Sequence, residues 1–248
     1  MMASNFKKFL YSNGLILALT MLILLVCFPV GGAIDLHLIQ PFMDASGNFI
    51  YRDNWYLVHW NHTVFKNILI AVYLSFLGLW LGSFKIQRLK VKRWLYGYMF
   101  LMSMLSTALV GILKSNAAHA CPWNMVEPTS VGYIWNFTAT HGHCFPGGHA
   151  STGFALLTGF FVYRLAQPKL AYLFLGLGLV MGFILGWGQM MRGAHFLSHN
   201  LWSGWIIFAF NFVVYSCFYA KFKTQTQASL SPNNIESLDL ITPIAQSD

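Results

Sequence analysis

The chain has 248 residues, of which 56% are hydrophobic and only 9% are charged. Soluble domains normally carry about 25% charged residues, so this composition excludes an ordinary soluble domain and indicates an all-α, polytopic membrane protein. The formal net charge is +8, but the basic residues stand in short clusters beside apolar runs. This pattern sets membrane topology and does not predict nucleic-acid binding.

The first predicted span covers about residues 15–33 and follows a short polar segment that contains Lys7 and Lys8. Lysines before an apolar run also describe a signal peptide, and the Gly-Gly-Ala of residues 31–33 offers a weak cleavage site. The run is longer than the usual core of a signal peptide, about 7–15 residues, which favours a retained helix.

Residues 34–66 mix acidic residues with tryptophan, tyrosine and phenylalanine. Aromatic residues with scattered charge are typical of a segment that lies at the membrane surface. His59 and His62 are three residues apart and would share a helix face. This spacing is weak evidence for a ligand pair, and packing at the interface is the favoured interpretation.

Five further spans are predicted, at about residues 67–84, 95–113, 150–166, 170–188 and 200–220. Five basic residues within 85–93 fall on the same side as the N-terminus, and the positive-inside rule assigns that side to the cytoplasm. All nine histidines fall in segments on the opposite, outer side. We therefore expect one membrane domain over residues 1–223 and, because the end is polar, a disordered cytoplasmic tail over 224–248.

Two motifs of the outer segments point to phosphate chemistry. Lys114 ends the span at 95–113 and is followed after six residues by Cys121-Pro122. The second motif, Pro146-Gly147-Gly148-His149, directly precedes the span at 150–166. It is typical of a helix start, where unpaired backbone N–H groups and a partial positive charge suit an anion.

The third motif places an arginine and two histidines at the outer end of the chain's last two spans. Arg192, His195 and His199 are separated by three and four residues, so on a helix they would share one face. Such residues are costly at a membrane span without a partner. Together with a lysine and a helix N-terminus they are complementary parts of a phosphate site.

The three motifs resemble those of the type 2 phosphatidic acid phosphatase superfamily of membrane lipid phosphatases. That family has Lys-x6-Arg-Pro, Pro-Ser-Gly-His and Ser-Arg-x5-His-x3-Asp, and here the third motif reads Gln189-x5-His195-x3-His199. The resemblance covers about residues 15–220, and the segment at 35–55 also looks like the lipid A phosphatase-like bacterial members. It implies six transmembrane helices in one bundle, an outward-facing active site, and no metal or other cofactor.

The resemblance also implies a role for each motif residue. His195 would be the nucleophile that becomes phosphorylated, and His149 would protonate the leaving group. Lys114 and the N–H groups near Gly147 and Gly148 would hold the phosphoryl oxygens. Positioning and charge neutralisation do most of the work in such transfers.

Three positions depart from the family pattern. Cys121 replaces the first-motif arginine. Gln189 replaces the third-motif arginine, although Arg192, one helical turn on, is able to reach the same phosphate. His199 stands where an aspartate normally orients and charges the nucleophile. Either another acid supplies that charge, with Glu127 and Asp53 as candidates, or the rate is lower.

Two cysteines lie in the same outward loop. In an oxidising compartment we expect Cys121 and Cys144 to form a disulfide that closes roughly two dozen residues, worth about 3 kcal/mol in the chain-entropy model. The alternative is a metal site built from these cysteines with His119, His141 and His143. Their spacing fits no regular zinc pattern.

The sequence therefore predicts a metal-independent phosphatase that acts on a phospholipid or glycolipid at the outer face of a bacterial inner membrane. Candidate substrates are lipid A, undecaprenyl diphosphate and phosphatidylglycerol phosphate. Transfer of phosphate between two lipids is a related alternative. A catalytically inactive protein that binds or transports lipid is the alternative of another class.

Overall fold

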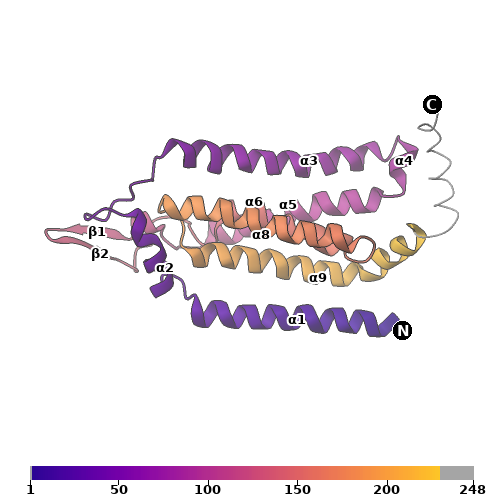
Figure 1. Cartoon of the computed structure of the whole chain (residues 1–248), viewed down its shortest axis with the longest axis horizontal. Coiled ribbons are helices and arrows are strands. Elements are labelled where there is room, and N and C mark those ends of the chain that lie inside the picture. The colour runs from indigo at the N-terminus through magenta and orange to yellow at the C-terminus, as the bar shows by residue number, and fades with distance from the viewer. Residues whose placement is uncertain (1, 230–248) are drawn as a thin grey trace, which may run out of the picture.

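The computed structural model describes residues 2–229 as a bundle of long helices with a small β-hairpin at one end (Figure 1). Its long helices are α1 (Met2–Cys27), α3 (Lys66–Gly82), α5 (Arg93–Asn116), α8 (Pro168–Met191) and α9 (Leu197–Ser229). Its shorter elements are α2 (Ala33–Ile39), η1 (Gln40–Phe42), η2 (Leu57–Phe65), α4 (Gln87–Lys90), η3 (Pro122–Asn124), β1 (Val126–Thr129), β2 (Gly132–Trp135), α6 (Gly148–Phe154) and α7 (Leu157–Tyr163).

Within residues 2–229, five helices are long and apolar enough to cross a membrane, where six were expected. They are Asn5–Cys27, Leu57–Gly82, Arg93–Asn116, Pro168–Met191 and Leu197–Gln227. The expected span at 150–166 is instead divided into α6 and α7, each of 7 residues. Because a continuous span needs about 20 apolar residues, neither helix crosses a bilayer alone.

The break between α6 and α7 has a local cause. The N–H groups of Leu156, Thr158 and Gly159 bond to carbonyls three residues earlier, at 3.2, 3.2 and 2.9 Å. Such bonds tighten the turn relative to an α-helix. The segment is therefore apolar and largely helical, as predicted, but its α-helical hydrogen bonds are interrupted between Phe154 and Leu157.

Helices α6 and α7 pack closely on α8 through small residues. A Cβ built on Gly153 would overlap the backbone of Gly182, and one on Gly182 would overlap the ring of Phe154. A Cβ on Gly186 would meet Asn200 of α9. Gly182 and Gly186, four residues apart on α8, thus let neighbouring helices approach closely, as small residues do between membrane helices.

The bundle has two distinct ends (Figure 1). The start of α1, the basic α4 and the end of α9 lie at one end, here called the α4 end. The hairpin of β1 and β2 lies with α2 at the other, here called the hairpin end. Lys85–Arg93 and the N-terminus thus share an end, as their charge pattern predicted.

Three segments differ in detail from what the sequence predicted. β1 and β2 pair antiparallel from Val126 with Trp135 to Thr129 with Gly132, and Gly132 closes the turn at a φ of 139°. The surface segment at 34–66 ends in η2, a π-helix that continues into α3. Helix α9 continues to Ser229, past the expected start of the tail at Thr224, and residues 230–248 lie outside the described residues.

Candidate active site

The first two motifs meet at the hairpin end. Lys114 lies in the last turn of α5, and Gly148 is the first residue of α6. A Cβ built on Gly148 would lie 3.5 Å from Nζ of Lys114. The ammonium group therefore stands directly beside the start of α6, where the first N–H groups have no intrahelical acceptor.

The second motif is tied to the start of α9 through its backbone. The N–H of Gly147 donates to the carbonyl of His199 at 3.0 Å, and Ser203 Oγ donates to the carbonyl of Gly147 at 2.9 Å. A Cβ at Gly147 would overlap Oδ1 of Asn200, so the close approach requires glycine. Because its N–H is already bonded, Gly147 does not offer that group to a phosphate, whereas Gly148 stands at the free helix start.

The third motif begins at a helix end that the sequence specifies. Helix α8 ends at Met191, and Gly193 then adopts a φ of 77°, the left-handed conformation that glycine provides after a helix. The chain turns there, and α9 starts at Leu197. His195 therefore lies in the turn, while His199 lies in the first turn of α9.

The two third-motif histidines contact each other through their Nδ1 atoms, which are 3.4 Å apart. Both side chains are buried, with 2% of His195 and none of His199 exposed. Nδ1 of His195 faces His199, so Nε2 is the ring nitrogen that takes no part in this contact. Burial lowers the pKa of His195 to about 3, with a smaller effect from the charge of Lys114, so the imidazole is neutral and nucleophilic at neutral pH.

Cys121 and Cys144 form the expected disulfide, with their Cα atoms 5.0 Å apart. The backbone of Cys144 makes a hydrogen-bonding contact with the rings of His195 and His199, and its N–H donates to the carbonyl of His119 at 2.9 Å. The disulfide thus fixes a backbone segment that touches both histidines. Because both sulfurs belong to this disulfide, neither is available as a ligand for the alternative metal site. Among residues 2–229 no group of three or more His, Cys, Asp or Glu side chains is arranged to hold a metal ion.

The family comparison assigns residues 94–223 to the PAP2 superfamily. This range is more than half of the 248 residues and contains all three motifs. The chain belongs to the PAP2 superfamily. Neither a curated protein nor a solved structure matches it. Membership supports a phosphatase-type function on lipid-like substrates, and the apolar helices make this PAP2 protein a multi-pass membrane protein.

One histidine from outside the matched range joins the site of this PAP2 protein. The ring of His62 lies 4.1 Å from that of His149, measured between centroids. His62 comes from the π-helix η2, and π-helical turns often occur at functional sites. Its spacing partner His59 instead stacks on Trp55 at 4.8 Å. Of the two histidines that the spacing paired, His62 therefore lies at the site and His59 does not.

Gln189 and Arg192 are connected to η2 and to the surface segment. Gln189 is buried, and its Nε2 donates to Oδ1 of Asn61 at 3.3 Å. Its Oε1 accepts a hydrogen bond from Arg192 at 3.2 Å, and Arg192 Nε donates to the carbonyl of Arg52 at 2.8 Å. Gln189 therefore orients Arg192, the residue expected to replace the missing arginine, and the charges of Arg192 and Lys114 both act on His62.

Neither acid suggested for the missing aspartate contacts His199. Glu127 is exposed in β1 and accepts a hydrogen bond from Asn136, while Asp53 is exposed and interacts with Arg192. The buried acid of this region is Asp35, of which 1% is exposed. The sequence placed Asp35 in a surface segment, and its burial against a residue far along the chain could not be inferred from that position.

Asp35 holds the start of α9. Its carboxylate accepts hydrogen bonds from the N–H and the hydroxyl of Ser198, at 2.9 and 2.5 Å, and from the N–H of Gly31 at 2.9 Å. Burial raises the pKa of Asp35, and the hydrogen bonds from Ser198 and Gly31 oppose that rise. Because Ser198 directly precedes His199, the carboxylate supports the third motif from behind without touching its imidazoles.

Proposed function

We propose that this PAP2 protein hydrolyses a phosphomonoester or diphosphate of a membrane lipid through a phosphohistidine on His195. The observation that carries the proposal is the buried Nδ1–Nδ1 contact between His195 and His199, beside Lys114 and the start of α6. This contact orients the nucleophile in the way that an acid orients a catalytic histidine. The proposal needs no metal in either step.

In the first step, Nε2 of His195 attacks phosphorus while the bond from phosphorus to the leaving oxygen breaks. His149 gives a proton to that oxygen. Lys114 and the N–H of Gly148 stabilise the negative charge on the phosphoryl oxygens, because both lie at the start of α6. Arg192, held by Gln189, contributes positive charge from the His62 side.

In the second step, water attacks phosphorus, the nitrogen–phosphorus bond breaks, and His149 takes the proton of the water. Inorganic phosphate leaves and His195 is neutral again. His199 accepts a hydrogen bond from Nδ1 of His195 throughout, but a neutral imidazole supplies no negative charge to balance the phosphohistidine. The proposed rate is therefore lower than that of a relative with aspartate at this position.

His149 is placed for proton transfer. Burial lowers the pKa of His149 to about 2, with smaller effects from His62 and His195, so the ring by itself is neutral at neutral pH. Its role as the acid of the first step therefore requires the negative charge of a bound phosphate, which raises that pKa. Its Nδ1 is buried, and no hydrogen-bond partner for it lies among the described residues. The ring of His62 packs against it, so its orientation is set by a second imidazole. A histidine that gives and takes a proton beside a phosphate is a common general acid and base.

The site is proposed to face the outer side of a bacterial inner membrane, with both termini in the cytoplasm. Two observations support this placement. The basic residues at 85–93 gather at the α4 end, which suits the cytoplasmic side. The disulfide lies at the hairpin end and requires an oxidising compartment. Lipid A, undecaprenyl diphosphate and phosphatidylglycerol phosphate remain the candidate substrates.

Phosphate release from these lipids by the purified protein tests the function, with His195→Ala as the control. We expect release from the wild type, resistance to EDTA, and loss in the variant. A reaction with a labelled phosphate donor, quenched with detergent at alkaline pH because the nitrogen–phosphorus bond of phosphohistidine is labile to acid, should trap label on the wild-type protein only. Equal release from both proteins would refute the proposed phosphatase activity. Lipid binding without phosphate release would favour the alternative of a catalytically inactive protein that binds or transports lipid.

A further inference from the structure

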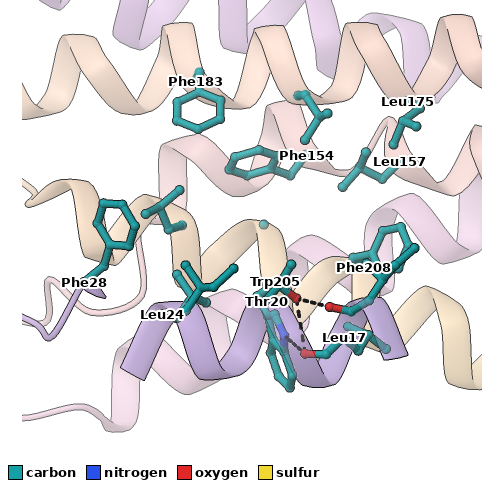
Figure 2. A pocket seen from close by; sticks show the side chains of 15 residues that line it. Leu17, Thr20, Leu24, Phe28, Phe154, Leu157, Leu175, Phe183, Trp205 and Phe208 are labelled. Carbon is teal, nitrogen blue, oxygen red and sulfur yellow. Dashed lines mark hydrogen bonds between the residues drawn. The ribbon is translucent and has the colours of Figure 1, made fainter. Parts of the chain in front are cut away.

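Among the cavities formed by the described residues, two with mainly apolar walls differ in their position relative to the histidines. The first, of about 440 Å³, is enclosed by α1, α8, α9 and the α6–α7 pair, with Phe154, Trp205 and Phe208 in its wall (Figure 2). The second, of about 560 Å³, lies between the end of α5 and the start of α9. It is lined mainly by Leu113, Asn116, Ala117, Phe145, Trp202 and Ile206. We call the second one the α5–α9 groove.

The α5–α9 groove is lined by residues that are sequence neighbours of the proposed phosphate site. Leu113 directly precedes Lys114, and Pro146, also in the groove wall, directly precedes Gly147. The ring of Phe145 lies 5.5 Å from that of His199 and 6.3 Å from that of Trp202, between centroids. One aromatic side chain therefore separates the groove from the third motif.

Helix geometry places the first cavity on the other side of α9. Trp202 and Ile206 follow His199 by three and seven residues, so they share its face. Gly204 and Phe208, which line the first cavity, follow it by five and nine residues and point about 140° and 180° away, at 3.6 residues per turn. A lipid with its phosphate at the histidines is therefore adjacent to the α5–α9 groove and separated from the first cavity by α9 itself.

The walls of the α5–α9 groove suit a hydrocarbon chain. Of its seven lining residues only Asn116 is polar, and its amide nitrogen donates to the carbonyl of Ile112 at 2.8 Å. Leu113 is 42% exposed, so the groove opens sideways at the surface of a membrane-spanning helix, where the surrounding medium is lipid. Its volume lies within the range of about 300–1,000 Å³ that small-molecule sites occupy.

We infer that the α5–α9 groove binds a hydrocarbon chain of the lipid substrate, which enters sideways from the bilayer and carries its phosphate to Lys114 and His195. This inference rests on the proposed function. It assigns a structural reason for acting on lipid phosphates: a substrate with a chain gains contact with Trp202 and Phe145, whereas a small phosphate ester reaches the same histidines without it.

Two substrates distinguish an effect on chain binding from an effect on phosphate transfer: long-chain phosphatidic acid, and the water-soluble p-nitrophenyl phosphate, which has no chain. For Trp202→Ala we expect kcat/KM for phosphatidic acid to fall roughly tenfold, because apolar contact with the chain is lost, while the value for p-nitrophenyl phosphate stays within about twofold. Trp205→Ala is the control on the side of the first cavity. It also removes the hydrogen bond from Trp205 Nε1 to the carbonyl of Leu17, so the thermal unfolding of both variants is measured alongside their kinetics.

A second pair of variants narrows the groove. Ala117→Phe fills it, and Ala118→Phe places the same ring on the neighbouring residue, which does not line it. We expect only Ala117→Phe to lower kcat/KM for phosphatidic acid selectively. Equal effects of Trp202→Ala and Ala117→Phe on both substrates, or effects equal to those of their controls, would overturn the inference.

Photo-labelling measures binding without turnover. Phosphatidic acid with a diazirine in its acyl chain, used with the wild-type protein in nanodiscs, should label residues 113–117 and 202–206. Excess phosphatidic acid should compete for that label, whereas phosphatidylcholine should not. Competable label at residues 16–28 instead would place the chain in the first cavity and refute the inference. If the wild type hydrolyses neither of these substrates nor any of the three candidate lipids, the proposed function fails, and this labelling alone decides whether the groove binds the chain.

Discussion

The two ends of the bundle bury different kinds of side chain. At the α4 end, Phe9, Tyr98, Phe161 and Tyr215 form a buried aromatic cluster, and the guanidinium of Arg164 lies 4.1 Å from the ring centroid of Phe9. At the hairpin end the helices bury histidines, amides and a carboxylate. Apolar burial stabilises a fold directly, whereas buried polar groups cost free energy unless they are bonded.

The hairpin end is not fully satisfied. Among the described residues, Nε2 of His199 and both side-chain polar atoms of Asn200 are buried without a hydrogen-bond partner. Three ties hold this costly region together: the disulfide from Cys121 to Cys144, the bond from Gly147 to His199, and the contact of Asp35 with Ser198. The α4 end also has buried polar atoms without a hydrogen-bond partner among the described residues, including the hydroxyl groups of Tyr98 and Tyr215. The two ends therefore differ mainly in what they bury, aromatic side chains at the α4 end and histidines, amides and a carboxylate at the hairpin end.

The largest effects are expected from one substitution at each end of the bundle, His149→Ala at the hairpin end and Phe161→Ala at the α4 end. His149→Ala should lower kcat about 10²–10⁴-fold, the range that general acid–base catalysis supplies, with little change in the midpoint of thermal unfolding. Phe161→Ala at the α4 end should do the reverse, lowering the free energy of unfolding by about 3–5 kcal/mol while the folded fraction keeps its kcat. Activity assays and thermal unfolding in detergent measure both. Full activity of His149→Ala would contradict its role.

Much of this division was predictable because the motifs are local signals. The pairing of Cys121 with Cys144, the helix start at Gly148 and the common end of the three motifs each follow from short stretches of sequence. The break between α6 and α7 was not predictable, since an apolar run looks alike whether its hydrogen bonds span three or four residues. His62 was undervalued because its segment reads as interfacial, and only the π-helix turns one of its histidines inward.

Asp35 illustrates the long-range part that sequence could not supply. It lies 163 positions from Ser198, and no local pattern links an acid of the surface segment to the start of α9. Glu127 and Asp53 were wrong as partners of His199 because the hairpin and the surface segment hold them at exposed positions. The carboxylate of Asp35 instead bonds to Ser198, and the imidazoles of His195 and His199 contact each other.

A change at Asp35 should affect both properties at once, which sharpens the comparison. Asp35→Ala leaves the Ser198 N–H without its acceptor, and we expect a loss of about 1–3 kcal/mol in the free energy of unfolding. Because the third motif loses its support, kcat should fall roughly tenfold or more, since small displacements of catalytic groups are costly. Ser198→Ala, which removes only the hydroxyl bond, is the milder control. A stability loss with unchanged kcat would show that Asp35 does not position the histidines.

Arg192 and Gln189 give a graded test within the hairpin end. Arg192→Ala removes a positive charge beside the site, and we expect a roughly tenfold loss in kcat/KM, as for one charge-assisted hydrogen bond to phosphate. Gln189→Ala should cost less, because Arg192 keeps its bond to the carbonyl of Arg52. Steady-state kinetics of the two variants give the order directly. The reverse order would mean that Gln189, and not Arg192, contacts the phosphate.

The last expected effect is a pH dependence of stability that originates at His195. Its pKa is about 3 in the folded protein and about 6.5 when unfolded, so between these values the unfolded chain binds the additional proton. The stability contributed by the neutral imidazole is therefore complete above about pH 6.5 and is lost as the pH falls towards 3, by at most about 1.4 kcal/mol per pH unit. His195→Asn cannot take up this proton, so its unfolding midpoint should fall less steeply between pH 7 and 4. Parallel curves for the two proteins would mean that His195 takes up its proton over the same pH range in the folded and unfolded states, so that burial does not lower its pKa.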